Sequence, residues 1–228
     1  CLESILKNDY PNYQIIVVDN ASQNESSQKI KEWAAGKQEV PIPENQELAA
    51  LSQPPFPKPI LFSVPNHDTV RFDVSKPMEP IVFLQLKKNF GFAGGNNAGL
   101  GYAFMKNDFK YAWLLNNDTV IAQDSLTKLV RKMELAEAHD MKCGIMGSKL
   151  YYYEPQEILH GVGGRFSPWL AHSWLIGNRQ KDSGQYDNGK FKQDFVIGAS
   201  MFVSKAFIED VGVMSEDYFL YNEEIDWC

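Results

Sequence analysis

Ile15-Ile16-Val17-Val18-Asp19-Asn20-Ala21-Ser22 is a short apolar run, rich in β-branched residues, that passes directly into polar side chains. Such a run is typical of a strand that is buried on both faces of a parallel sheet. Where the strands of an open α/β sheet end in Asp or Asn, polar side chains gather along one edge, and ligands bind at that edge. We therefore predict a buried strand over residues 14–18. We also predict that a ligand-binding site lies at the edge of the sheet where this strand ends.

The same pattern of an apolar run followed by polar residues returns three times. Residues 81–86 lead into a glycine-rich stretch over 89–97, residues 111–115 lead into Asn116-Asn117-Asp118, and an aromatic run over 218–221 leads into Asn222-Glu223-Glu224-Ile225-Asp226. Helices are expected between these runs: one that Ser22 caps and that reaches about Trp33, one from the glycine-rich loop to about Met105, and one over 125–138. Strands that alternate with helices predict an α/β fold with a mostly parallel sheet and helices on both faces.

The last third of the chain carries weaker signals. We expect a strand over 143–150, an apolar stretch over 195–203 with Gly198-Ala199-Ser200 at its middle, and a short helix over 205–211 that Gly212 ends.

Residues 37–80 interrupt the alternation. Nine of the twelve prolines lie there, between positions 41 and 80. Because proline fits neither a helix interior nor a central strand, we expect no regular helix and no central strand in this segment. Within this segment, residues 60–64 and 69–74 could still form a hairpin at the edge of the sheet. We interpret 37–80 as an insertion within a single domain that covers residues 1–228.

Composition excludes several classes of protein. A chain of 228 residues with 44% hydrophobic and 22% charged residues is typical of a globular domain, and a net charge of −7 argues against a nucleic-acid-binding protein. The three cysteines lack paired or metal-ligand spacing, which favours the cytoplasm, and no run of about 18 apolar residues would cross a bilayer. Attachment at the inner face of the membrane stays open. The first and last residues resemble interrupted elements, so we expect a chain truncated at both ends.

The polar stretches suggest particular chemistry. Glycines in 89–97 would let the backbone approach a ligand, although the stretch matches neither the dinucleotide fingerprint nor the Walker loop and could be a tight turn. The Asp19 carboxylate could accept hydrogen bonds from a nucleotide or serve as a turn residue. Asp118 suits Mg²⁺ or Mn²⁺ held together with substrate phosphates. The acidic residues over 223–226 could supply a general base or could favour the positive end of a helix.

These four motifs, in this order, resemble family 2 glycosyltransferases of the GT-A fold, which is Rossmann-like, and in particular the bacterial rhamnosyltransferase branch. The resemblance covers nearly everything except 37–80. It implies an inverting transfer of a sugar from a UDP-, dTDP- or GDP-linked donor to a glycan or a lipid-linked glycan, in cell-surface polysaccharide synthesis.

The resemblance also implies roles for individual residues. Glu224 would be the catalytic base, with Asp226 in support, and Asp118 would hold the metal ion. Gly198, Ala199 and Glu223 would line the acceptor or sugar pocket. The remaining matched positions would bind the nucleotide-sugar: Asp19, Asn20, Ser22, Asn89, Gly91, Phe92, Gly94, Gly95, Asn96, Asn117 and Asp118.

The metal motif departs from the family pattern, because Asn116 and Asn117 precede Asp118 and leave a single carboxylate. Metal affinity without a nucleotide should therefore be weak. Two other functions share parts of this pattern. A non-catalytic module that binds a nucleotide-sugar or a carbohydrate would keep the same motifs. A nucleotidyltransferase would need a glycine-rich basic loop near its start, and this sequence shows none.

Overall fold

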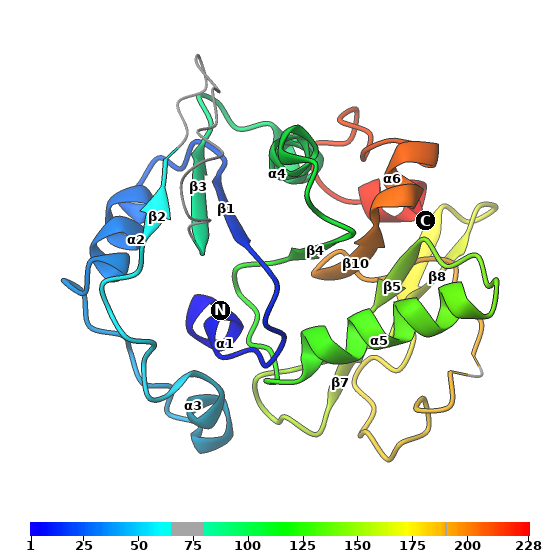
Figure 1. The fold of residues 1–228 in the computed structure, drawn as a ribbon. Helices are drawn as coiled ribbons and strands as arrows, with labels where there is room; N and C mark the ends of the chain where they lie inside the picture. The colour runs from blue at the N-terminus through cyan, green and yellow to red at the C-terminus, as the bar shows by residue number, and fades with distance from the viewer. Residues whose placement is uncertain (65–79, 190) are drawn as a thin grey trace. The chain divides into compact units, whose positions relative to one another are not determined.

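The computed structural model describes residues 1–64, 80–189 and 191–228. These residues form two compact units, which are described one at a time. The first unit comprises Cys1–Asn107 and Val120–Thr127, and the second comprises Asp108–Thr119 and Lys128–Cys228. Both helices and strands are present, as expected for an α/β fold (Figure 1). In the part of the chain that the structure describes, no helix is both long and apolar enough to cross a membrane.

The first unit is built on a parallel sheet in the order β1-β3-β2 (Figure 1). Its elements are α1 (Leu2–Leu6), β1 (Ile15–Asp19), α2 (Ser26–Ala34), α3 (Gln46–Ser52), β2 (Phe62–Ser63), β3 (Ile81–Gln85) and α4 (Gly91–Lys106). The register pairs Ile15 with Ile81 and Asp19 with Gln85. Asp19 therefore stands at the carboxyl end of the sheet, as the sequence predicts.

Successive side chains of β1 enter two different clusters. Ile15 is buried with Leu6, Ala34, Ile60 and Ile81, and Val17 packs against this cluster. Ile16 and Val18 pack against a second cluster of Val82, Leu84 and Tyr102 of α4. Because neighbouring side chains of a strand point to opposite faces, helices cover both faces of this parallel sheet.

The proline-rich segment is more ordered than the sequence predicts. A regular helix, α3, forms in its proline-free part, where Asn45 accepts hydrogen bonds from the backbone N–H groups of Glu47 (2.9 Å) and Leu48 (3.3 Å). The expectation of no regular helix was therefore wrong. Proline restricts only the residues around it, and this cap starts a helix beyond its reach.

Only the first half of the predicted edge hairpin, 60–64 with 69–74, falls on described residues, so the hairpin stays a prediction. Phe62 and Ser63 form β2, which runs parallel to β3, and residues 69–74 lie outside the described part of the chain. Ile60 is 5% exposed, and its N–H donates to the Ala34 carbonyl (2.8 Å). Ile60 thus joins the buried core cluster of the first unit, and Phe62 packs against that cluster.

The second unit is built on an antiparallel sheet in the order β4-β10-β5. Its strands are β4 (Tyr111–Leu115), β5 (Ile145–Gly147), β6 (Leu150–Tyr151), β7 (Leu159–Gly161), β8 (Gly164–Ser167), β9 (His172–Leu175) and β10 (Ser200–Ser204), and its helices are most of α5 (Ser125–Ala138), α6 (Lys205–Val211) and α7 (Glu223–Trp227). All five residues of β10 are buried. Among the described strands, parallel pairing is therefore confined to the sheet of the first unit.

Two predicted apolar runs are broken by turns in the second unit. The run over 143–150 divides into β5 and the start of β6. The run over 195–203 turns before β10, where the Ser200 N–H donates to the Ile197 carbonyl (3.0 Å). As a result, Gly198 and Ala199 lie in a turn at the start of a central strand.

Candidate active site

Asp19 is buried at the end of β1, with an exposed fraction of 7%. Its Oδ1 accepts a hydrogen bond from the Ser22 N–H (2.9 Å), and its Oδ2 accepts one from the Ser27 hydroxyl. The Gln85 side chain donates in turn to the Ser27 hydroxyl (2.9 Å). Burial opposes ionisation of Asp19, but these hydrogen bonds outweigh it and lower its pKa below the ordinary value. The edge of the sheet therefore carries a fixed negative charge.

Ser22 does not cap α2, contrary to the prediction. The helix begins at Ser26, and its N-cap residue Glu25 makes no side-chain capping bond. Ser22 instead gives its backbone N–H to Asp19, while the Asn24 side chain accepts from the Ser26 N–H (3.0 Å). The turn that Asp19 stabilises occupies the residues where a cap at Ser22 would lie, so the helix starts one turn later.

Asn20 and Asn89 link the end of β1 to the start of α4. Asn20 Nδ2 donates to Asn89 Oδ1 (3.0 Å) and to the Gly91 carbonyl (2.8 Å), and Asn20 Oδ1 accepts from the Phe90 N–H (3.0 Å). Asn89 Oδ1 also accepts from the Gly91 N–H (2.8 Å). Two predicted site residues that are 69 positions apart are thus brought together, and they hold the first residues of α4.

The glycine-rich stretch is mostly helical, so the prediction of a loop over 89–97 was wrong beyond Gly91. Gly91 has φ +74° and makes the turn into α4, whereas Gly94, Gly95 and Asn96 lie within the helix. A Cβ atom on Gly95 would lie 3.2 Å from the Asn20 side chain. Glycine is a poor helix former, but here its small size lets α4 approach the end of β1.

The predicted residues of the second unit begin with the turn after β4. The Asn116 N–H donates to the Ala199 carbonyl (3.0 Å), which joins this turn to the predicted pocket residues Gly198 and Ala199. Asn117 and Asp118 are exposed, and the Asp118 carbonyl accepts a hydrogen bond from the Tyr153 hydroxyl. The backbone is therefore held while the Asp118 side chain faces solvent.

The predicted acidic residues form the short helix α7, and their surroundings differ. Glu223 is 2% exposed, and within the described residues its Oε2 has no hydrogen-bond partner. Glu224 is half-buried, and burial, together with the negative charge of Glu223, raises its pKa. Asp226 is exposed. Of the three, Glu224 combines access to solvent with a raised pKa.

Trp227 positions α7, a role that the sequence analysis did not assign. Its indole N–H donates to the Gly212 carbonyl at the end of α6 (3.0 Å), and its ring meets Phe207 edge-on with the ring centroids 5.5 Å apart. The signal was available, because an aromatic residue three positions after Glu224 would lie on one face of a helix and could pack there. Ser27, the partner of Asp19, was missed as well, and no sequence motif marks it.

The folded chain is therefore an α/β protein whose strand ends carry carboxylates and amides. A family model described as glycosyl transferase family 2 matches residues 1–50 and 73–212, and the chain belongs to this family. Helix α7, with Glu224, lies beyond the matched residues.

One curated relative is a low-salt glycan biosynthesis hexosyltransferase, Agl10, of Haloferax volcanii. The two sequences are 26% identical over 154 residues, which cover 66% of this chain and 46% of the relative. The chain thus spans about half the length of the curated relative that it matches.

Proposed function

We propose that this protein transfers a sugar, with inversion, from a nucleotide-diphosphate sugar to an acceptor hydroxyl. Membership in glycosyl transferase family 2 supports a transferase, and the similarity to a glycan biosynthesis hexosyltransferase supports a role in glycan synthesis. The single observation that carries the assignment of the base is the half-buried position of the Glu224 carboxyl in α7, where burial raises its pKa. A carboxylate whose pKa is raised toward neutral pH is a stronger base while it is still ionised.

In the proposed reaction Glu224 takes the proton of the acceptor hydroxyl as its oxygen attacks the anomeric carbon. The bond from that carbon to the diphosphate breaks, the bonding electrons leave with the nucleotide diphosphate, and the configuration inverts in this single displacement. No covalent intermediate on the enzyme is needed. Trp227 would act as a positioning residue, since it fixes the helix that carries Glu224.

Asp118 would hold Mg²⁺ or Mn²⁺. No group of three His, Cys, Asp or Glu side chains among the described residues could hold a metal ion. A single exposed carboxylate nevertheless fits an ion that takes most of its ligands from substrate phosphates and water, as Mg²⁺ does in many phosphate-binding sites. When bound, the ion would supply positive charge to the departing diphosphate.

The nucleotide is proposed to contact the edge formed by Asp19, Asn20 and the start of α4. Each oxygen of a carboxylate can accept more than one hydrogen bond, so a base or ribose group could add to the bonds from Ser22 and Ser27. The donor nucleotide would be UDP, dTDP or GDP. The same proposal includes a rhamnosyl donor and a lipid-linked glycan acceptor. It also includes a role in bacterial surface polysaccharide synthesis and a location at the inner face of the membrane.

The test is donor turnover by Glu224→Gln, with Asp210→Asn as a matched control that removes an exposed charge from α6. UDP-, dTDP- and GDP-sugars are offered with Mn²⁺, and nucleotide diphosphate release is measured beside donor binding. Glu224→Gln should lose about 10²–10⁴-fold in turnover and keep donor binding. Unchanged turnover would remove Glu224 from the role of base. Donor binding without any turnover by the unmodified protein would favour the non-catalytic module.

Asp118→Asn tests the metal separately. Donor binding should weaken when Mn²⁺ or Mg²⁺ is present and should not change in EDTA. An equal loss of binding under both conditions would contradict a metal role for Asp118.

A further inference from the structure

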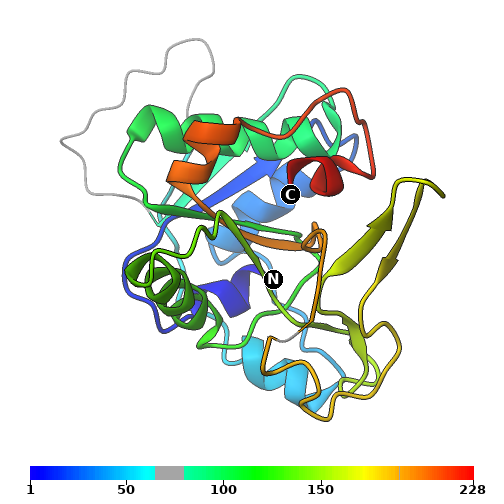
Figure 2. The ribbon, with the colours of Figure 1, turned by 90° about the vertical axis from the view of Figure 1, so that its right-hand side faces the viewer.

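The β8–β9 hairpin of the second unit presents apolar side chains to solvent at its turn. Its register runs from Gly164 opposite Leu175 to Ser167 opposite His172. In the turn, Trp169 is 97% exposed and Leu170 is 76% exposed. In Figure 2 the hairpin, in yellow-green, extends beyond the other strands of the second unit. These two side chains therefore contribute almost nothing to the core.

The hairpin is anchored at its base. The Gly164 N–H donates to the Phe195 carbonyl (2.9 Å), and the Ile176 N–H donates to the Gly163 carbonyl (2.9 Å). Asp194 accepts hydrogen bonds from the Arg165 side chain (2.8 Å) and from the Phe166 N–H (2.9 Å). A fixed base with an apolar turn is the geometry of a rigid protrusion.

The protruding part is free of charge. Residues 166–178 contain no Asp, Glu, Lys or Arg, although such residues make up 22% of the chain. The nearest charged residues on either side are both arginines, Arg165 and Arg179. An uncharged turn loses little hydration free energy when it leaves water, whereas a charged one loses much.

We propose that the turn of the β8–β9 hairpin inserts Trp169 and Leu170 into the headgroup region of a phospholipid bilayer. Tryptophan is favoured there, because its ring is apolar and its indole N–H can meet polar headgroups. Arginines that flank an inserted segment lie level with the phosphates. The neighbouring carboxylate of Asp194 is paired with Arg165, so this pair adds little net charge of either sign near the bilayer.

Two other occupants fit less well. A second copy of the chain would need an interface of about 1,000 Å² or more, and a single turn offers far less. A glycan would need several polar groups beside the tryptophan to bond its hydroxyls, but the turn Pro168-Trp169-Leu170-Ala171 carries one, the indole N–H, and the next polar side chains are those of the flanking pair Ser167 and His172. Insertion into a bilayer surface, in contrast, needs exposed apolar side chains and no array of hydrogen-bonding groups beside them.

The experiment is co-sedimentation of the full-length protein with large unilamellar vesicles of phosphatidylcholine, alone or with phosphatidylglycerol. The test variant carries Trp169→Ser and Leu170→Ser. The control is Leu135→Ser, which removes an apolar side chain of α5 that is 58% exposed. Partitioning of the test variant should fall about tenfold for each side chain removed, and the control should bind like the unmodified protein. Thermal unfolding should be unchanged in the test variant, whose two side chains are largely exposed, and should fall slightly in the control, because serine is a weaker helix former than leucine.

Two results would overturn the proposal: no binding of the unmodified protein to either kind of vesicle, or equal binding of the test variant. A fall in oligomeric state of the test variant with no change in vesicle binding would point to a second copy. Donor turnover with a water-soluble acceptor should survive the double substitution. The membrane contact and the proposed transfer can therefore fail independently.

Discussion

Asn20 Nδ2 donates a hydrogen bond to Asn89 Oδ1 over 3.0 Å, and this contact joins the end of β1 to a residue two positions before α4 begins. The same amide donates to the Gly91 carbonyl, so the turn into the helix is fixed by a side chain from another element. The space for that side chain is left by Gly95, where a Cβ atom would lie 3.2 Å from Asn20 Nδ2. Stability at this edge of the first unit should therefore depend on which glycine of α4 is replaced.

Gly95→Ala and Gly101→Ala form a matched pair within one helix. Alanine in a helix interior is more stable than glycine by about 0.5–1 kcal/mol. A Cβ atom on Gly101 would meet nothing within 4 Å, so Gly101→Ala should gain this amount. Gly95→Ala should show no such increase in the free energy of unfolding, because the new Cβ atom would force the Asn20 side chain to move. Urea unfolding of both variants measures the difference, and an equal gain at both positions would contradict the packing role of Gly95.

The sequence predicted best the elements whose pattern is strongest. The β-branched runs gave β1 and β3 to within one residue, and β4 and α5 have the predicted bounds. The pattern did not predict that the glycine-rich part of α4 is helical, because glycine disfavours a helix. Glycine is needed there because α4 packs closely against the end of β1. Helix α3 was missed for another reason: its cap, Asn45, is visible in the sequence but stands among prolines.

Glu3 and Lys58 form a buried ion pair that attaches the proline-rich segment to α1. Glu3 Oε1 lies 2.5 Å from Lys58 Nζ, with side-chain exposures of 7% and 14%, and also accepts from the Trp33 indole N–H (2.8 Å). Glu3→Gln should destabilise the protein by about 3–5 kcal/mol, since a buried charge loses its partner. The measurement is the free energy of unfolding in urea.

Glu25→Gln is the control for this pair. The Lys29–Glu25 pair spans 3.5 Å and is exposed by 59% and 79%, so its loss should change the free energy of unfolding by less than about 1 kcal/mol. Equal effects of Glu3→Gln and Glu25→Gln would show that the proline-rich segment is not held by Glu3.

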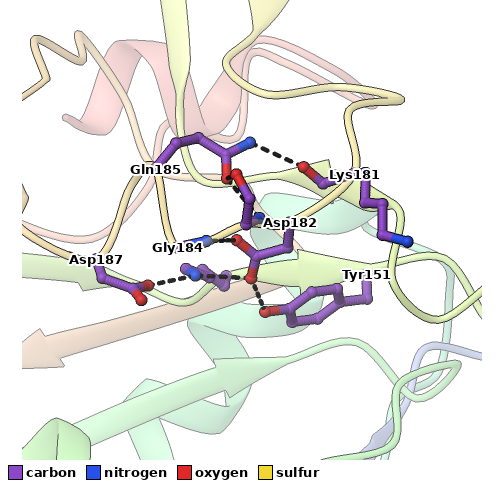
Figure 3. Close-up of polar contacts among 8 residues, drawn as sticks. Tyr151, Lys181, Asp182, Gly184, Gln185 and Asp187 are labelled. Carbon is purple, nitrogen blue, oxygen red and sulfur yellow. Dashed lines mark hydrogen bonds and ion pairs between the residues drawn. The ribbon is translucent and has the colours of Figure 1, made fainter.

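Asp182, whose polar contacts are drawn in Figure 3, should contribute to the stability of the second unit in a way that is lost in acid. Its carboxylate accepts hydrogen bonds from Lys149 Nζ (2.8 Å), the Tyr151 hydroxyl (2.5 Å) and the Gly184 N–H (3.0 Å). These bonds, that of Lys149 first, lower the pKa of Asp182 from 3.8 to about 2. Because the folded pKa is the lower one, the stabilisation is complete above pH 3.8 and is lost as the pH falls toward 2.

Asp182→Asn should therefore lower the melting temperature at pH 7, and the difference from the unmodified protein should shrink as the pH falls below 3.8. Asp187→Asn is the control, since Asp187 contacts the same lysine but is 66% exposed, and its loss should matter less. A difference for Asp182→Asn that stays constant from pH 7 to pH 2 would exclude this pH linkage.

Sequence motifs predicted where some candidate residues lie, but not how deeply they are buried. The apolar run of β1 predicted that Asp19 and Asn20 lie at a strand end, and the acidic run predicted a helix start that contains Glu224. The acidic run by itself did not distinguish Glu223 from Glu224, because both follow the same aromatic residues, and only the family resemblance assigned the base to Glu224. Their difference arises from burial, which leaves Glu223 2% exposed and Glu224 partly open to solvent.

Glu224 should show opposite effects on stability and activity. Burial first, and then the charge of Glu223, raises its folded pKa above the ordinary 4.5, so the ionised side chain disfavours the folded state. This cost is absent below pH 4.5 and appears as the pH rises through the folded pKa. Glu224→Gln should therefore raise the melting temperature at pH 7, leave it unchanged near pH 3.5, and lower turnover by about 10²–10⁴-fold. Asp226→Asn, at an exposed position, should leave the melting temperature unchanged at both pH values. If Glu224→Gln instead melts at a lower temperature at pH 7, its carboxylate is stabilised by the fold and is not the strained base that the proposed transfer requires.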